Sequence, residues 1–201
     1  MIDLTERRIM AAAELRVDAE DDGTKKIKGY AAVFGKRSVD LGGFVEIIKP
    51  GAFKNVLKGK PDVRALVNHD PSMVLGRTTA GTLRLSEDDK GLAVEIDPPD
   101  TQIARDLMAS IGRGDVDQMS FAFRVGEERW TYPEADDDAP VLREIREVSE
   151  LMDVSAVTYP AYPDTTVAVR SRDAGRPAAT PLPTPNLDHA RLRLAEAELS
   201  A

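Results

Sequence analysis

The sequence predicts an α+β fold built around a β-barrel-like or curled, mostly antiparallel sheet with a few flanking helices. Many short segments rich in strand-forming residues follow one another at close spacing, and a single segment shows clear helical periodicity. The regular alternation of strand and helix that a doubly wound parallel sheet requires is missing. The pattern therefore favours a curled or closed antiparallel sheet.

The expected strands are bounded by turns rich in aspartate, proline and glycine, residues that favour tight reversals of the chain. The first six strands are expected at residues 26–34, 43–48, 63–68, 73–78, 82–86 and 91–96. Three more are expected at residues 118–125, 141–148 and 151–158. The acidic stretch at residues 134–138 is expected to be a solvated hairpin loop.

One helix is expected at residues 100–111, with Gly112 as its C-terminal stop. Apolar residues at helical spacing share one face of this segment: Ile103, Leu107, Met108 and Ile111. A second, short helix is expected at residues 51–57.

The composition changes sharply after residue 170. Residues 1–170 read as one globular domain, whereas residues 171–186 contain four prolines and no apolar periodicity, which is typical of an extended linker. Residues 187–201 are expected to form a short helical or disordered tail that either frays or docks on a partner, since so short a helix is marginal alone in water.

The composition excludes several kinds of chemistry. The 201 residues include 27 basic and 35 acidic side chains, a net charge of −8, with no cysteine and two histidines, His69 and His189. Disulfides, thiol nucleophiles and thiolate or multi-histidine metal sites are therefore not expected, and neither is a metal ion or other cofactor. The acidic balance argues against nucleic-acid binding. No apolar stretch reaches the roughly 18 residues of a membrane span, so a soluble, cytoplasmic protein without membrane contact is expected.

Common catalytic motifs are absent from the sequence: the P-loop, the glycine-rich dinucleotide fingerprint, the paired-histidine metalloprotease helix and the G-x-S-x-G nucleophile elbow. An α/β-hydrolase is therefore not expected.

His69 is the first candidate for such a site. It follows an apolar strand and precedes the Asp70-Pro71 turn, and side chains at strand ends often face clefts. Histidine is the common general base near neutral pH. The alternative is a histidine that merely caps the strand with a hydrogen bond. His189 lies in the tail, which leaves His69 as the imidazole of the globular part.

Ser120 is the candidate nucleophile. The period of two along its strand puts it on one face with Ala122 and puts Met119, Phe121 and Phe123 on the other. A face of small residues beside a serine leaves room for a substrate. The alternative is a serine on the polar face of a half-buried strand.

Asp153 is the candidate orienting acid. It lies between Met152 and Val154 in a strand, where burying a carboxylate is costly unless it is paired. A histidine is a natural partner, because the carboxylate orients the imidazole and stabilises its charged form. The alternative is an outward-facing aspartate, and Glu147 and Glu150 are rivals for the same role.

Five segments of the chain form a recognisable set. In order they read IKGYAAVF, FVEIIKPGAF, VNHD with the VLGRTTAGTLRLSEDDKGL that follows, DVDQMSFAF, and MDVSAVTYPAYPDT. Over about residues 14–170 the chain resembles the prohead serine proteases of tailed bacteriophages, capsid-maturation peptidases related in fold to herpesvirus assemblin. The resemblance implies the catalytic triad His69, Ser120 and Asp153. The family often has glutamate at the third position, so Glu150 is the alternative acid.

The resemblance also implies a function. A serine endopeptidase of this family would process the scaffold region or N-terminal extension of the major capsid protein, and itself, inside the procapsid in the host bacterial cytoplasm. Assemblin-like relatives tend to form homodimers through a helix, for which residues 100–111 are the candidate; the alternative is that this helix only packs on the core. The chemistry requires an oxyanion hole, for which an amide near Arg77 or in the turn at residues 112–114 is available. The alternative function is a non-catalytic capsid-assembly scaffold or chaperone.

Overall fold

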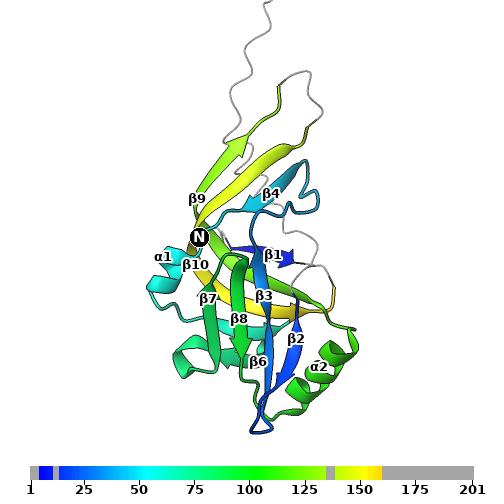
Figure 1. The fold of residues 1–201 in the computed structure, drawn as a ribbon. Helices are drawn as coiled ribbons and strands as arrows, with labels where there is room; N and C mark the ends of the chain where they lie inside the picture. The colour runs from blue at the N-terminus through cyan, green and yellow to red at the C-terminus, as the bar shows by residue number, and fades with distance from the viewer. Residues whose placement is uncertain (1–4, 11–13, 135–138, 160–201) are drawn as a thin grey trace, which may run out of the picture.

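The structure is a computed structural model that describes residues 5–10, 14–134 and 139–159. In these residues two β-sheets pack against each other around the main apolar core, with short helices at the margins (Figure 1). The predicted α+β class, dominated by antiparallel strands, is confirmed. The expected linker at 171–186, the expected tail at 187–201 and His189 all lie outside the described residues.

The larger sheet has six strands and carries the candidate site. Along it the strands run in the order β1, β9, β10, β5, β6, and β4 also pairs with β10. Their bounds are Glu6–Met10 (β1), Phe44–Ile48 (β4), Arg64–Val67 (β5), Asp70–Arg77 (β6), Gln118–Thr131 (β9) and Val141–Val157 (β10). The pairs β10–β4 and β10–β5 are parallel, whereas β1–β9, β9–β10 and β5–β6 are antiparallel.

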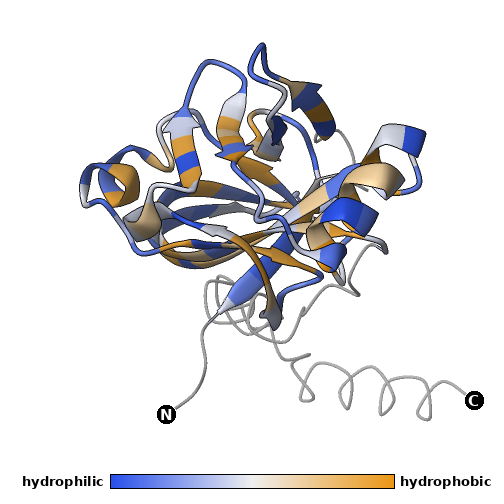
Figure 2. Cartoon of the chain, turned by 90° about the horizontal axis from the view of Figure 1, so that it is seen from below, coloured by the Kyte–Doolittle hydropathy of each residue, from blue (hydrophilic) through white to orange (hydrophobic). Residues whose placement is uncertain are grey.

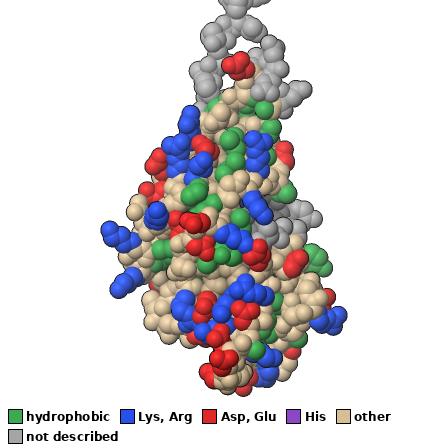
Figure 3. All heavy atoms as spheres, viewed as in Figure 1, with side chains coloured by type: hydrophobic (Ala, Val, Ile, Leu, Met, Phe, Trp, Pro, Cys, Tyr) green, Lys and Arg blue, Asp and Glu red, His purple; other side chains and the backbone are tan. Residues whose placement is uncertain are grey.

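The smaller sheet has four antiparallel strands in the order β2, β3, β8, β7. Their bounds are Arg16–Ala19 (β2), Lys25–Val33 (β3), Leu83–Glu87 (β7) and Gly91–Ile96 (β8). Its outer face, seen in Figure 3, mixes basic and acidic side chains. Arg84, for example, bonds both Glu95 and Asp97 there, at 2.7 and 2.6 Å.

Helix α2 spans Gln102–Arg113, close to the predicted helix. Thr101 caps it by accepting a hydrogen bond from the Ala104 amide, and Gly114 ends it with φ of 80°, a left-handed conformation that glycine adopts without cost. Leu107 and Ile111 are buried as predicted, but Ala104 rather than Ile103 faces the core in the first turn, which leaves Ile103 43% exposed. Helix α1, Lys54–Lys58, is one turn long, and the 3₁₀ turn η1 spans Thr78–Ala80.

The core lies between the two sheets. Strand β9 contributes Phe121 and Phe123, whose rings stack at 4.6 Å, and Phe53 meets Phe121 edge-on at 5.7 Å. These aromatic side chains are fully buried. Figure 2 shows apolar and polar residues alternating along the strands, as burial of one sheet face requires.

Strand β10 differs from the prediction of two strands at 141–148 and 151–158. It is one continuous strand that pairs along its length with β9. Register shifts interrupt the pairing between Ile145 and Asp153, so bulges absorb the change of pattern that suggested a break. Strands β9 and β10 pair in antiparallel fashion, and residues 135–138 of the expected hairpin loop lie outside the described residues.

Strand β1 was not predicted, because its sequence ERRIM carries three charges. Two of them are buried in an ion cluster in which Arg143 bonds both oxygens of Glu6 at 2.7 and 2.8 Å and Arg8 bonds both oxygens of Glu46 at 2.8 and 3.0 Å. Arg143 also bonds Glu46 at 2.9 Å and Glu128 at 2.6 Å. The cluster therefore joins β1 to β4, β9 and β10.

Burial by itself would raise the pKa of Glu6. The hydrogen bond from Arg143 and the charges of Arg8 and Arg143 outweigh that effect and hold the pKa of Glu6 below its ordinary value. Glu6 therefore stays ionised inside the protein, where it anchors the first strand.

Candidate active site

His69 lies in the two-residue turn of the β5–β6 hairpin, which Val67 and Asp70 close as a cross-strand pair. Both turn residues have positive φ, 52° at Asn68 and 58° at His69. Positive φ at both central positions is the signature of a type I′ turn, where Asn-Gly is the preferred pair. Histidine at the second position is unusual and costs about 1–3 kcal/mol of backbone strain. Such strain typically persists where the surrounding structure holds a functional residue in place.

Asn68 attaches this turn to the end of β10. Its amide donates to the Ala156 carbonyl at 2.9 Å, and its side-chain Oδ1 accepts from the amide of Thr158 at 3.0 Å. The imidazole next to it is therefore fixed relative to β10, the strand that carries Asp153.

Ser120 and Asp153 lie on the outer face of the larger sheet. Ser120 in β9 is directly opposite Ser155 in β10, and Ala122 is opposite Asp153. Met119, Phe121 and Phe123 belong to the core cluster, as period-two alternation predicts. The polar residues of both strands thus share the face that points away from the core.

On that face the three predicted site residues come together. Nε2 of His69 is 2.6 Å from Oγ of Ser120, and Nδ1 is 2.6 Å from Oδ1 of Asp153. The side chains of His69 and Asp153 are 8% and 11% exposed, and Ser120 is fully buried. In this arrangement the carboxylate orients the imidazole, and the other ring nitrogen can take the proton of the hydroxyl.

Ser155 is a further member of this group that was not predicted. Its Oγ donates to Oδ1 of Asp153 at 2.8 Å and lies 3.3 Å from Nδ1 of His69. The sequence held a signal for it: residues two apart in a strand face the same side, so Ser155 had to accompany Asp153.

The rival acids lie elsewhere. Glu150 is 51% exposed and forms an ion pair with Arg124 at 2.6 Å. Glu147 lies opposite Glu127, where the β9–β10 register is interrupted. The carboxylate that bonds His69 in this structure is that of Asp153.

Two amides of the regions expected to supply the oxyanion hole are engaged within the protein. The Arg77 amide donates to Oγ1 of Thr82 at 3.0 Å, and the Gly114 amide donates to the Ile111 carbonyl at 3.0 Å. The donors of the oxyanion hole therefore stay a prediction.

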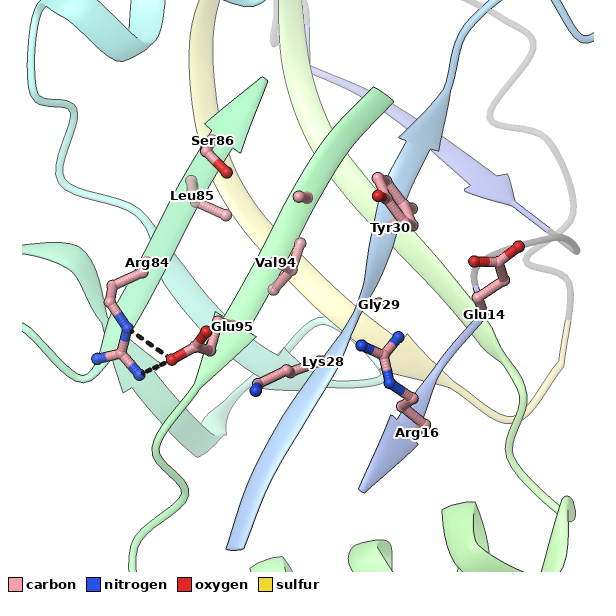
Figure 4. A pocket seen from close by; sticks show the side chains of 11 residues that line it. Glu14, Arg16, Lys28, Gly29, Tyr30, Arg84, Leu85, Ser86, Val94 and Glu95 are labelled. Atoms are coloured by element: carbon pink, nitrogen blue, oxygen red, sulfur yellow. Dashed lines mark hydrogen bonds and ion pairs between the residues drawn. The ribbon is translucent and has the colours of Figure 1, made fainter. Parts of the chain in front are cut away.

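Two hollows lie away from this site. One of about 410 Å³ is on the outer face of the smaller sheet, where Arg84 bonds Glu95 beside Lys28 and Arg16 (Figure 4). The other, about 490 Å³, lies between α1 and β7 and is largely apolar. Neither is lined by His69, Ser120 or Asp153.

In the part of the chain that the structure describes, no group of three or more histidine and acidic side chains is arranged to hold a metal ion. No helix in the same residues is long and apolar enough to cross a membrane.

A buried serine hydroxyl, an imidazole and a carboxylate in hydrogen-bonded series, on a sheet-rich α+β fold, is the arrangement used by serine hydrolases. The model of the caudovirus prohead serine protease family matches residues 13–177 of this chain. The chain therefore belongs to that family.

The chain is also similar to individual proteins. The prohead protease of Enterobacteria phage HK97 is 32% identical over 152 residues, which cover 74% of this chain and 61% of that protein. Among solved structures, the bacteriophage T4 capsid assembly protease is similar with a TM-score of 0.42 and 10% identity, covering 77% of this chain and 99% of that one.

Proposed function

We propose that the protein is a serine endopeptidase that cleaves the major capsid protein, in its scaffold region, and itself during procapsid maturation. The observation that carries the proposal is the imidazole of His69 bonded to Ser120 on one side and to Asp153 on the other. Membership of the prohead serine protease family and the 32% sequence identity to the HK97 prohead protease support it.

The mechanism follows from these contacts. Oγ of Ser120 attacks the carbonyl carbon of the scissile peptide while its proton passes to Nε2 of His69. The tetrahedral intermediate collapses as the imidazolium returns that proton to the leaving amine, which leaves an acyl-enzyme on Ser120. A water molecule then repeats the sequence, and the acid product departs. Asp153 keeps the proton of the neutral imidazole on Nδ1 and stabilises the imidazolium.

The proposed setting is the interior of the procapsid in the host bacterial cytoplasm. Residues 171–201 are proposed to act as a linker and tail that dock the domain of residues 1–170 in the assembling shell or are removed by self-cleavage. A homodimer through α2 is part of the same proposal, supported by the exposure of Ile103 on that helix.

The experiment is co-expression of the protein with its capsid protein, followed by mass spectrometry of both. The wild type is expected to give defined cuts in the capsid protein and self-trimming, and Ser120→Ala and His69→Ala are expected to give neither. Ser149→Ala is the matched control, because Ser149 lies on β10, the strand paired with β9, but its hydroxyl bonds the main chain of Arg124 outside the site.

A fluorophosphonate provides a second readout that needs no known substrate. It is expected to label the wild type and His189→Gln but not Ser120→Ala. Absence of labelling, together with unchanged capsid-protein processing in Ser120→Ala, would leave a non-catalytic assembly scaffold or chaperone as the function.

A further inference from the structure

Ser155 is buried completely, at the centre of the larger sheet. Its neighbours by register are Ser120 on β9 and Leu66 on β5, and both are buried as well. A buried hydroxyl must find hydrogen-bond partners or lose about 1–3 kcal/mol. Those of Ser155 are Asp153 and His69, and neither the proposed mechanism nor the family resemblance assigns it a role.

The single hydrogen of the Ser155 hydroxyl is used in the bond to Oδ1 of Asp153, at 2.8 Å. A hydroxyl has one donor and two acceptor lone pairs, so Oγ presents a lone pair to Nδ1 of His69, 3.3 Å away. Nδ1 therefore faces two acceptors, the carboxylate oxygen and this hydroxyl oxygen. A nitrogen in that position must carry the hydrogen.

We propose that Ser155 is a positioning residue that holds His69 in the Nδ1–H tautomer and Asp153 in its bonded rotamer. The inference rests on the proposed function. An unprotonated Nε2 then faces the hydroxyl of Ser120, which is the state that a general base requires before acylation. Oδ1 of Asp153 accepts hydrogen bonds from both His69 and Ser155. The Asp153 side chain is therefore held by a residue of its own strand as well as by the imidazole.

The test is ¹⁵N NMR of histidine-labelled protein in a His189→Gln background, where His69 gives the remaining imidazole signals. The parent is expected to show the Nδ1–H tautomer at neutral pH. Ser155→Ala is expected to give a mixture with Nε2–H, whereas Ser155→Thr keeps the hydroxyl and is expected to restore the parent spectrum. Ser149→Ala, on the same strand, is the matched control.

The same variants are compared by their rate of fluorophosphonate labelling. Loss of one net hydrogen bond is worth about a factor of ten in rate, so Ser155→Ala is expected to react roughly tenfold more slowly. Ser155→Thr and Ser149→Ala are expected to stay within about twofold of the parent. Ser155→Cys, which nearly preserves the volume with a weak donor, replaces the alanine variant if that variant does not fold.

An unchanged tautomer in Ser155→Ala overturns the proposal, whether or not labelling slows, because slower labelling alone would reflect packing. A redistributed tautomer with slower labelling, rescued by threonine, supports it. The NMR readout does not depend on catalysis. Failure of the parent to be labelled would therefore count against the proposed protease function and leave the test of Ser155 intact.

Discussion

Ser120 and Ser155 are direct cross-strand partners on β9 and β10, and the imidazole of His69 contacts both of them through different nitrogens. Nε2 is 2.6 Å from Oγ of Ser120, whereas Nδ1 is 3.3 Å from Oγ of Ser155. The two hydroxyls are therefore not equivalent. The one at Nε2 can give up its proton to the ring, whereas the one at Nδ1 is engaged with Asp153.

The identity of the acid is tested by Asp153→Asn against Glu150→Gln. An asparagine amide can donate to Nδ1 and so favour a hydrogen on Nε2, which removes the general base. Fluorophosphonate labelling of Asp153→Asn is expected to fall by roughly 10⁴-fold, as in other triads. Glu150→Gln, whose carboxylate pairs with Arg124, is expected to stay within about twofold of the wild type. The opposite ranking would assign the role to Glu150.

The turn that holds His69 is tested at Asn68, which has φ of 52° and accepts hydrogen bonds from Thr158. Asn68→Ala loses the acceptor and strains the backbone, so the free energy of unfolding is expected to fall by about 1–3 kcal/mol. Asn68→Gly keeps the left-handed conformation and is expected to lose less. Urea unfolding measures both variants, and an equal loss in the two would mean that the conformation contributes nothing.

The buried ion cluster is tested by Arg143→Met. Removing the guanidinium leaves the carboxylates of Glu6 and Glu46 facing one cation instead of two, and breaking such buried pairs costs about 3–5 kcal/mol. Arg84→Met is the control, because its ion pairs lie at the surface of the smaller sheet and contribute less than about 1 kcal/mol. Similar losses of unfolding free energy in the two variants would contradict a special role for the cluster.

The lowered pKa of Glu6 also predicts that the free energy of unfolding depends on pH. Its pKa in the folded protein is held below the ordinary 4.5, so its contribution is complete above that value and is lost as the pH falls toward the lowered pKa. The free energy of unfolding is expected to decline as the pH falls below the ordinary pKa of 4.5. In Glu6→Gln the decline should be shallower. Identical slopes for the two proteins would show that Glu6 is not linked to folding.

Elements whose pattern is local could be predicted from the sequence. The alternation in β3 and β8 and the helical spacing in α2 indicate which face of each element is buried, and these elements lie within one or two residues of their predicted places. Strand β1 could not be predicted in this way. The charges of Glu6 and Arg8 are compatible with a buried strand because Arg143 and Glu46, distant in the chain, neutralise them.

At the site, too, features with a local pattern could be predicted, whereas features that depend on contacts between distant segments could not. Its three predicted residues were found from strand ends, strand faces and family resemblance, and the structure brings them within hydrogen-bonding distance. The left-handed turn was not foreseen, because Asn68-His69 lacks the glycine that usually signals it. Ser155 was not foreseen because serine in a strand is common. Its contacts with Asp153 and His69 can be assigned only once the pairing of β5, β9 and β10 is known.

Strand β10 has a consequence for the order in which the protein is made. It supplies Asp153 and Ser155 and pairs with β4 and β5, which are translated about a hundred residues earlier. A nascent chain that has exposed His69 and Ser120 outside the ribosome still lacks the strand that would orient the imidazole. The proposed triad is therefore completed only after β10 has been synthesised and has paired with β9.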